Sequence, residues 1–307
     1  MKVVLTGANG FIGFHTTKEL LVQGYQVKAV DLNTDKLSNL ELNPKLSIYQ
    51  IDLTSPEFAN IIEQNDKVLH LGAVAHFVGR EEAGKAVKIN VEGTINVLES
   101  CVKKKAERIV YSSTGSVYSS DVEVPIREDA KLGPSYDNYY GWSKLQSEQW
   151  IRNYQRFLPY VILRYAYVYG SQKDWGAIGA FLKQIKAGEQ PTVFGGNQTN
   201  DFVYVKDVVD VNIKALETSY TNQVFNVGTG RATSIRDACQ YCLEALGSPL
   251  EMKIEPSRTF DYSVFLYDIS KANSLLNYVP KWNLLNGIKD MVKENVFAQN
   301  IPALQHS

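Results

Sequence analysis

The chain has 307 residues, of which 44% are hydrophobic and 21% are charged, a composition typical of a globular protein with a large core. The formal net charge is −1 with both signs dispersed, which argues against nucleic acid or an anionic membrane as the main partner. No apolar run is long enough to span a membrane, no signal-peptide pattern opens the chain, and three cysteines fit a reducing compartment, so we expect a cytoplasmic protein. The four scattered histidines give no reason to expect a metal site.

A strand, a glycine-rich loop and a helix are predicted at the start of the chain. The strand covers residues 2–6 and the helical pattern covers residues 15–23. The loop between them contains Gly7, Gly10, Phe11, Ile12 and Gly13. Glycines in this context let the backbone approach a pyrophosphate at the positive end of the helix. The loop therefore predicts dinucleotide binding, and a tight turn without a ligand is the alternative.

The next three predicted strands place polar or small residues at their ends. Residues 26–30 end in Asp31, whose carboxylate can accept hydrogen bonds from an adenosine ribose and would repel a 2′-phosphate. This favours NAD over NADP. Residues 46–51 lead to Asp52 and Leu53, which could flank the adenine. Residues 67–71 end in Leu71, Gly72 and Ala73, where small side chains allow a second ribose to come close.

A long helix is predicted over residues 81–104, with Asn90 on its buried side. A buried amide needs hydrogen-bond partners, so Asn90 is expected to hold a water or a backbone group near the site. The fifth strand, residues 108–111, delivers Ser112 and Thr114. Hydroxyl groups at the carboxyl end of a parallel strand lie where open α/β sheets bind ligands.

Tyr140 and Lys144 are the predicted catalytic pair. Residues four apart share one face of a helix, so both side chains should enter one pocket. A fixed ammonium favours a phenolate and would lower the pKa of Tyr140 from its ordinary value of ~10. The pair is then an acid/base for a substrate hydroxyl. The spacing alone is weak, because such pairs also occur by chance on amphipathic helices.

Together these motifs resemble the extended short-chain dehydrogenase/reductases, specifically the NAD-dependent epimerase/dehydratase family. The resemblance extends over residues 2–290 in the family's order. The matching residues are Thr6–Gly13, Asp31, Asp52–Leu53, His70–Ala73, Asn90–Thr94, Tyr111–Tyr118, Tyr140, Lys144, Leu163–Tyr165, Val168–Gly170, Asp201–Asp207, Asn226–Gly228, Arg258–Asp261 and Asp268–Ala272.

The resemblance implies an α/β fold: a Rossmann doubly wound parallel sheet with a smaller C-terminal α/β substrate lobe. The NAD domain would cover residues 1–165, with segments near 200–230 returning to it, the substrate lobe mostly residues 166–297, and a tail residues 298–307. The resemblance also implies that Thr114 hydrogen-bonds the reacting hydroxyl, Tyr140 takes its proton, and Lys144 holds the nicotinamide ribose. Family members commonly form homodimers through the helices expected here at 81–104 and 138–157.

The family's reactions differ in the residues that follow Thr114. Dehydratases carry Asp-Glu there and decarboxylases a glutamate, whereas this chain has Gly115 and Ser116. Hydride transfer alone remains, as in 4-epimerisation of a UDP-hexose through a transient 4-keto sugar. The alternative is an NAD(P)-dependent dehydrogenase or 4-ketoreductase acting on a deoxysugar nucleotide or another alcohol.

Five further residues are expected at the substrate by resemblance. Tyr167 and Asn200 stand where the family usually has asparagine and arginine, which weakens the expected diphosphate contacts, since asparagine cannot replace a bidentate arginine. Arg258 and Asp261 keep the expected contacts to phosphate and uridine ribose. Phe265 corresponds to the residue that gates the sugar pocket, and its bulk would favour plain hexoses over N-acetylated sugars; ordinary packing is the alternative.

Overall fold

A parallel sheet of seven strands is the frame of the candidate site. The computed structural model describes residues 1–74, 83–257 and 264–299, with side chains as far as residue 294. The chain divides into two units. The first consists of Met1–Ala166, Val208–Val227 and Asp268–Tyr278, and the second of Tyr167–Asp207, Gly228–Tyr267 and Val279–Ser307.

The sheet of the first unit has the strand order β10-β6-β5-β4-β1-β2-β3, and every pairing in it is parallel. Its strands are β1 (Lys2–Thr6), β2 (Gln26–Asp31), β3 (Leu46–Gln50), β4 (Lys67–His70), β5 (Arg108–Thr114), β6 (Tyr160–Tyr165) and β10 (Gln223–Val227). The reversal of strand order next to β1 makes the sheet doubly wound, as the sequence predicts. Strands such as β4 and β6 are buried along their whole length, because helices cover both faces of a parallel sheet.

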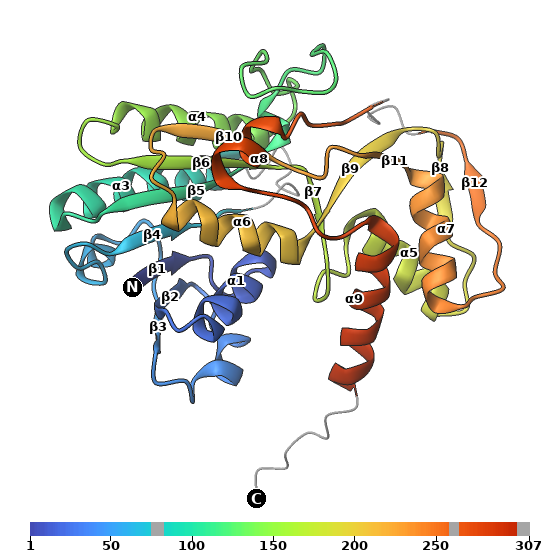
Figure 1. Ribbon diagram of the computed structural model, residues 1–307, viewed down its shortest axis with the longest axis horizontal. Coiled ribbons are helices and arrows are strands. Elements are labelled where there is room, and N and C mark those ends of the chain that lie inside the picture. The colour runs from blue at the N-terminus through green and yellow to red at the C-terminus, as the bar shows by residue number, and fades with distance from the viewer. Residues whose placement is uncertain (75–82, 258–263, 300–307) are drawn as a thin grey trace, which may run out of the picture. The chain divides into compact units, whose positions relative to one another are not determined.

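Helices cover the two faces of this sheet (Figure 1). The first unit contains α1 (Phe11–Val22), α2 (Ala83–Ala86), α3 (Gly93–Lys104), α4 (Tyr139–Asn153), most of α6 (Val205–Glu217) and α8 (Ser270–Leu276). Figure 1 shows α3 and α4 on one face and α1 and α6 on the other. Under α3 and α4, a core of buried side chains extends from Val97 and Leu98 to Tyr111 and Ile151. This packing fixes both helices against the strands that lie beneath them.

The predicted single helix over residues 81–104 is interrupted. Residues Val87–Glu92 form a π-helical turn between α2 and α3, and Asn90 lies in its middle. A π-helical turn shifts the side chains that follow it, and such turns are frequent at functional sites. The hydrophobic period alone could not reveal it, because the stripe of buried residues continues through the turn.

The second unit contains two small sheets and four helical segments in its described part. One sheet has the order β11-β9-β7 and the other pairs β12 with β8. Its strands are β7 (Tyr167–Tyr169), β8 (Thr192–Phe194), β9 (Thr199–Tyr204), β11 (Ala232–Ser234) and β12 (Lys253–Glu255). Its helices are α5 (Gly176–Lys186), the first turn of α6, α7 (Ile235–Leu246) and α9 (Leu284–Gln299).

Local signals explain where these helices start and stop. Ser234 caps α7 by accepting a hydrogen bond from the Asp237 amide, and Gly247 ends that helix in the left-handed region at φ 58°. The Asn138 side chain caps α4 through the Gly141 amide. None of the helices in the described part of the chain is both long and apolar enough to cross a membrane.

Candidate active site

The glycine loop after β1 is packed so tightly that two of its glycines admit no side chain. Gly7 has φ +70°, and a Cβ added to it would lie 2.6 Å from the Gly72 amide nitrogen. A Cβ on Gly13 would lie 2.0 Å from the Gly7 carbonyl oxygen, whereas a Cβ on Gly10 would meet only that oxygen at 3.1 Å. Gly10 is also the N-cap of α1, with no side-chain cap. The loop thus brings bare backbone and the start of a helix together, which is the geometry that a pyrophosphate needs. Phe11 and Ile12 open α1 directly behind it and are partly buried.

Asp31 at the end of β2 reaches the same loop. Its carboxylate accepts hydrogen bonds from the Asn9 amide at 2.9 Å and from the Asn33 amide at 3.3 Å. These two contacts fix the carboxylate beside the glycine loop while Asp31 stays partly exposed. The placement suits a ribose hydroxyl as hydrogen-bond donor and is unfavourable for a 2′-phosphate.

The other predicted cofactor residues line the neighbouring strand ends. Asp52 accepts hydrogen bonds from the amide and the hydroxyl of Thr54, both at 2.8 Å, and these contacts lower its pKa. Leu53 is buried, and its side chain packs against Gly72 and Gly93, where an added Cβ would meet it at 2.7 and 3.1 Å. The strand-end segment that begins at Leu71 is tied to β1, because the Leu71 amide donates to the Thr6 carbonyl. Ala73 follows Gly72 in this segment and is partly buried.

A chain of hydrogen bonds connects β1 to the helix that carries Asn90. Thr6 Oγ1 lies 2.6 Å from His70 Nδ1 and accepts from the Gly72 amide. His70 Nε2 lies 3.0 Å from Thr94 Oγ1, which donates to the Asn90 carbonyl. Burial, with a smaller contribution from the charge of Lys144, lowers the pKa of His70 to about 3. His70 is therefore a neutral link between backbone segments, with its proton on Nε2, and does not act as an acid.

Asn90 is fully paired. Its side chain exchanges hydrogen bonds with the Val74 backbone at 2.8 and 3.1 Å and donates to Ser143 Oγ at 2.9 Å. The backbone carbonyl of Asn90 also accepts a hydrogen bond from Ser147 Oγ at 2.7 Å. The amide therefore ties the strand-end segment after β4 to α4, between Tyr140 and Lys144. The sequence predicts that Asn90 holds a water or a backbone group, and the structure shows it bonded to the backbone of Val74.

The end of β5 supplies the hydroxyl groups. Ser112 Oγ donates to the His70 carbonyl at 3.2 Å, so it braces β5 against β4. Thr114 is partly exposed, and its Oγ1 accepts from the Ser116 amide at 3.2 Å. The Ser112 hydroxyl therefore holds two strands together, whereas the Thr114 hydroxyl, two residues further along β5, stays accessible.

Tyr140 and Lys144 lie on α4, one turn apart. Lys144 is 1% exposed, and its Nζ lies 4.1 Å from the centroid of the Tyr111 ring, a cation–π contact that partly replaces lost water. Burial lowers the pKa of Lys144 to about 7, and Glu148 acts in the opposite direction. Burial raises the pKa of Tyr140 to about 12. This direction is opposite to the one that the sequence predicts, because desolvation of the phenol disfavours its charged form.

These residues fit a dinucleotide. The glycine loop, the carboxylate of Asp31 and the small residues at 72 and 73 lie along one edge of the sheet. Larger side chains at the glycine positions would obstruct a dinucleotide bound there. Lys144 lies at the same edge, because Tyr111, beneath it, pairs with His70 of β4. The site can thus hold NAD and present a phenol and an ammonium to a hydroxyl.

Besides Thr114 and Tyr140, which lie in the first unit, the predicted substrate residues belong to the second unit. The Tyr167 ring lies edge-on to Phe265 at 5.5 Å between centroids and 6.1 Å from Phe202. The Phe265 amide donates to the Thr199 carbonyl at 2.9 Å, next to Asn200 on β9. The structure therefore brings Tyr167, Asn200 and Phe265 together. Arg258 and Asp261 lie outside the described residues.

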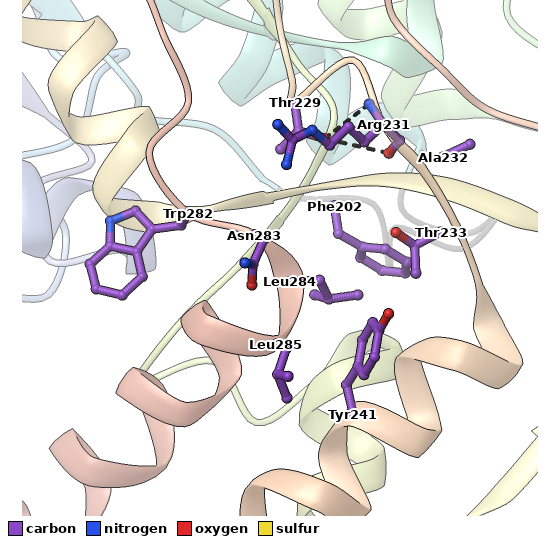
Figure 2. Close-up of a pocket in the computed structure, with 10 residues that line it drawn as sticks. All are labelled: Phe202, Thr229, Arg231, Ala232, Thr233, Tyr241, Trp282, Asn283, Leu284 and Leu285. Atoms are coloured by element: carbon purple, nitrogen blue, oxygen red, sulfur yellow. Dashed lines mark hydrogen bonds between the residues drawn. The ribbon is translucent and has the colours of Figure 1, made fainter.

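A cavity of ≈ 380 Å³ also lies within the second unit (Figure 2). It is lined by Phe202, Thr229, Arg231, Ala232, Thr233, Tyr241, Trp282, Asn283, Leu284 and Leu285. Figure 2 shows the rings of Phe202 and Tyr241 pointing into the same space from β9 and α7. None of the predicted site residues that the structure describes lines this cavity.

Sequence reasoning misses two residues next to Lys144, one on β5 and one further along α4. Tyr111 provides the aromatic floor, and Glu148 is a fully buried carboxylate one turn beyond Lys144. The four-residue step from Lys144 to Glu148 is a signal that could have identified the latter, because a charge on the buried face of a helix needs a partner.

Comparisons with known proteins agree with this geometry. The model of the family described as "NAD dependent epimerase/dehydratase family" matches residues 3–228. A putative UDP-glucose 4-epimerase of Methanocaldococcus jannaschii is 34% identical over 303 residues, covering 94% of this chain and 97% of that protein.

Solved structures give the same picture. The UDP-glucose 4-epimerase of Thermotoga maritima, solved with UDP-glucose, has a TM-score of 0.89 at 32% identity and covers 97% of this chain and 100% of its own. The UDP-glucuronic acid 4-epimerase of Bacillus cereus, solved with UDP-glucuronic acid and NAD, has a TM-score of 0.86 at 30% identity and covers 96% of this chain and 100% of its own.

Proposed function

Because the chain belongs to the NAD-dependent epimerase/dehydratase family, we propose that it is a sugar-nucleotide 4-epimerase that acts on a UDP-hexose. The observation that carries the proposal is a complete Tyr140–Lys144 pair with glycine and serine directly after Thr114. Elimination of water or carbon dioxide needs an additional carboxyl group there. The M. jannaschii and T. maritima proteins, matched over nearly their whole length, are described as 4-epimerases, putatively so for the former.

We assign the catalytic roles that the family resemblance implies. The Tyr140 phenolate takes the proton of the sugar 4-hydroxyl and becomes a phenol, which returns the proton to the same oxygen after the 4-keto sugar has rotated. The Thr114 hydroxyl hydrogen-bonds the same oxygen and orients it. The buried Lys144 carries its positive charge one helical turn from Tyr140, and this charge favours the phenolate form.

The cofactor site is formed by residues of the first unit. The glycine loop would hold the pyrophosphate, Asp31 the adenosine ribose, Asp52 and Leu53 the adenine side, and Leu71–Ala73 with Asn90 and Ser112 the nicotinamide side. Bound NAD would supply the acceptor that takes hydride from C4 of the sugar and returns it to the opposite face.

The substrate side rests on the second unit. We assign Tyr167, Asn200 and Phe265 to the nucleotide and sugar, together with Arg258 and Asp261 as phosphate and ribose contacts. The bulk of Phe265, packed edge-on against Tyr167, supports a preference for plain hexoses over N-acetylated sugars.

The test is turnover on a panel of UDP-, GDP-, dTDP- and CDP-sugars, followed by NMR of the epimers and by nicotinamide absorbance. We expect interconversion of a UDP-hexose pair without net change of the nicotinamide redox state. Tyr140→Phe should lose turnover by at least ~10²-fold while keeping NAD, and Tyr139→Phe is the matched control, with little expected loss. Net formation of NADH would instead identify a dehydrogenase, and full activity of Tyr140→Phe would refute the assigned base.

We further propose a cytoplasmic homodimer assembled through α3 and α4. Support comes from Trp142 and Trp150 on α4, which are 41% and 42% exposed, since large apolar side chains of this kind commonly mark interfaces.

A further inference from the structure

Glu148 is the only acidic side chain on α4, yet it is completely buried. Its exposed fraction is 0%, as is that of its partner Arg164 on β6. Arg164 Nε lies 2.9 Å from Glu148 Oε1 and Arg164 Nη2 lies 2.7 Å from Oε2, which makes the contact bidentate. Isolated buried ions are very unfavourable, so a pair of this kind persists only with near-ideal geometry and further hydrogen bonds.

The further hydrogen bonds connect the pair to the elements that carry the catalytic groups. Ser113 Oγ, from the residue before Thr114, donates to Glu148 Oε1 at 2.5 Å. On the other side, Arg164 Nη1 donates to the Tyr118 hydroxyl at 2.9 Å and to the Glu128 carbonyl at 3.1 Å. The carboxylate therefore joins the helix of Tyr140 and Lys144 to the strand of Thr114.

We propose that Glu148 is a positioning residue of this reaction, which holds α4 in register with the end of β5 and supports the positive charge of the Lys144 ammonium one turn away. The proposal rests on the proposed function for its catalytic consequence, but not for its structural content. Residues four apart on a helix lie ≈ 5–6 Å from each other at Cβ, close enough for the carboxylate to act on the ammonium.

The described neighbours of Lys144 other than Glu148, namely His70, Tyr111 and Tyr140, supply no negative charge. His70 is neutral, Tyr111 contributes only its ring face, and the pKa of Tyr140 lies well above neutral. In the described part of the chain, several charged or titratable groups face this part of α4. They are His70 of β4, Tyr111 of β5, Tyr160, Arg164 and Tyr165 of β6, Lys271 of α8, Tyr118 and Glu128 of the segment between β5 and α4, and, on α4 itself, Tyr140, Lys144, Glu148 and Arg152. Glu148 is the one acidic side chain among the causes that shift the pKa of Lys144, and it acts against the effect of burial.

The test separates charge from structure by removing each half of the pair. Glu148→Gln keeps the shape and the hydrogen bond from Ser113 but leaves the Arg164 charge unbalanced, so the pKa of Lys144 should fall by about one unit. Arg164→Met leaves the carboxylate unbalanced, so that pKa should rise by a similar amount. Ser113→Ala removes a hydrogen bond without changing any charge and should leave it unmoved.

The readout is the pKa of Lys144 in the NAD-loaded protein, measured by NMR with lysine labelled at Cε and assigned with Lys144→Met. It does not depend on the identity of the sugar. In the pH profile of kcat, the acidic and alkaline limbs should both shift to lower pH for Glu148→Gln and to higher pH for Arg164→Met. Glu148→Gln should therefore lose about ten-fold in kcat at pH 8.

Equal pKa values of Lys144 in the wild type, Glu148→Gln and Arg164→Met would overturn the proposal, even if both variants melt at lower temperature. If Arg164→Met does not fold, the comparison of Glu148→Gln with Ser113→Ala still decides, since only the former should shift the pKa. Absence of any epimerase turnover in the wild type would refute the proposed function and leave the NMR result unaffected.

Discussion

Substitution of two glycines in the same loop should separate folding from cofactor binding. In Gly13→Ala the new Cβ would lie 2.0 Å from the Gly7 carbonyl oxygen, 2.8 Å from the Gly7 carbonyl carbon and 2.9 Å from Ala8 Cα. All three atoms are backbone, so none can move aside by changing a rotamer. In Gly10→Ala the new Cβ meets only the Gly7 oxygen, at 3.1 Å, and the backbone at φ −69° accepts any residue.

The magnitudes follow from these distances. Relief of the Gly13→Ala overlap requires a shift of about 1 Å between α1 and the loop, and overpacking of this severity costs ~2–4 kcal/mol of unfolding free energy. For a chain of this size that corresponds to a melting temperature lower by roughly 5–10 °C. Gly10→Ala should cost less than ~1 kcal/mol, but its methyl group faces the place of the pyrophosphate, so NAD affinity should fall at least ~10-fold.

The assay is thermal unfolding of both variants without ligand, followed by calorimetric titration with NAD. We expect Gly13→Ala to lose stability and binding together, and Gly10→Ala to lose binding alone. A Gly13→Ala protein with the melting temperature and NAD affinity of the wild type would show that the tight packing of α1 on the loop is not required. Equal stability losses in both variants would contradict the distinction between the two positions.

Three further substitutions test other parts of the site and its assembly. Lys144→Met should abolish turnover yet raise the melting temperature near neutral pH. The folded-state pKa of Lys144 is about 7 and the unfolded value is near 10.4, so burying the charge costs most below pH 7, and the gain should shrink as pH rises from 7 to ~10.5; a melting temperature unchanged at pH 6 would contradict this. Asp31→Ala should weaken NAD binding ~10–100-fold and NADP binding much less, measured against the exposed control Asp35→Ala; equal losses for both cofactors would rule out Asp31 as the discriminating group. Trp150→Glu should convert the dimer to a monomer in light scattering after size exclusion, whereas Trp175→Glu, outside α4, should not; an unchanged mass for Trp150→Glu would exclude this interface.

The strand–loop–helix order made the fold predictable from the sequence. The predicted strand at Lys67–His70 is buried along its whole length, as a strand of a covered parallel sheet should be. The glycines at 7, 10 and 13 identify the turn between the first strand and the first helix. The NAD-dependent family membership is likewise confirmed, because its motifs are spread over most of the chain. The strand, loop and helix signals specify the path of the backbone, and the path of the backbone defines the fold.

The environment of Tyr140 was less predictable, because it depends on how deeply each group is buried. The four-residue spacing correctly places Tyr140 and Lys144 on one helix, but the pKa of the phenol follows desolvation, which sequence spacing does not report. The π-helical turn at Asn90 could not be predicted for a related reason, because one extra residue in a turn leaves the stripe of hydrophobic residues almost unchanged. Long-range pairs such as Glu148 with Arg164 require the tertiary fold to be known first.

The neutral imidazole between Thr6 and Thr94 has a consequence for the interpretation of kinetics. An activity that declines near pH 6.5 is ordinarily attributed to a titrating histidine, and among the described residues His70 lies next to the reacting groups. Its pKa of about 3, and the hydroxyl groups on both of its nitrogens, remove it from that role. An inflection near pH 6.5 in this enzyme therefore does not report the His70 imidazole, and replacing that imidazole by a neutral hydrogen-bonding side chain should leave the inflection where it was.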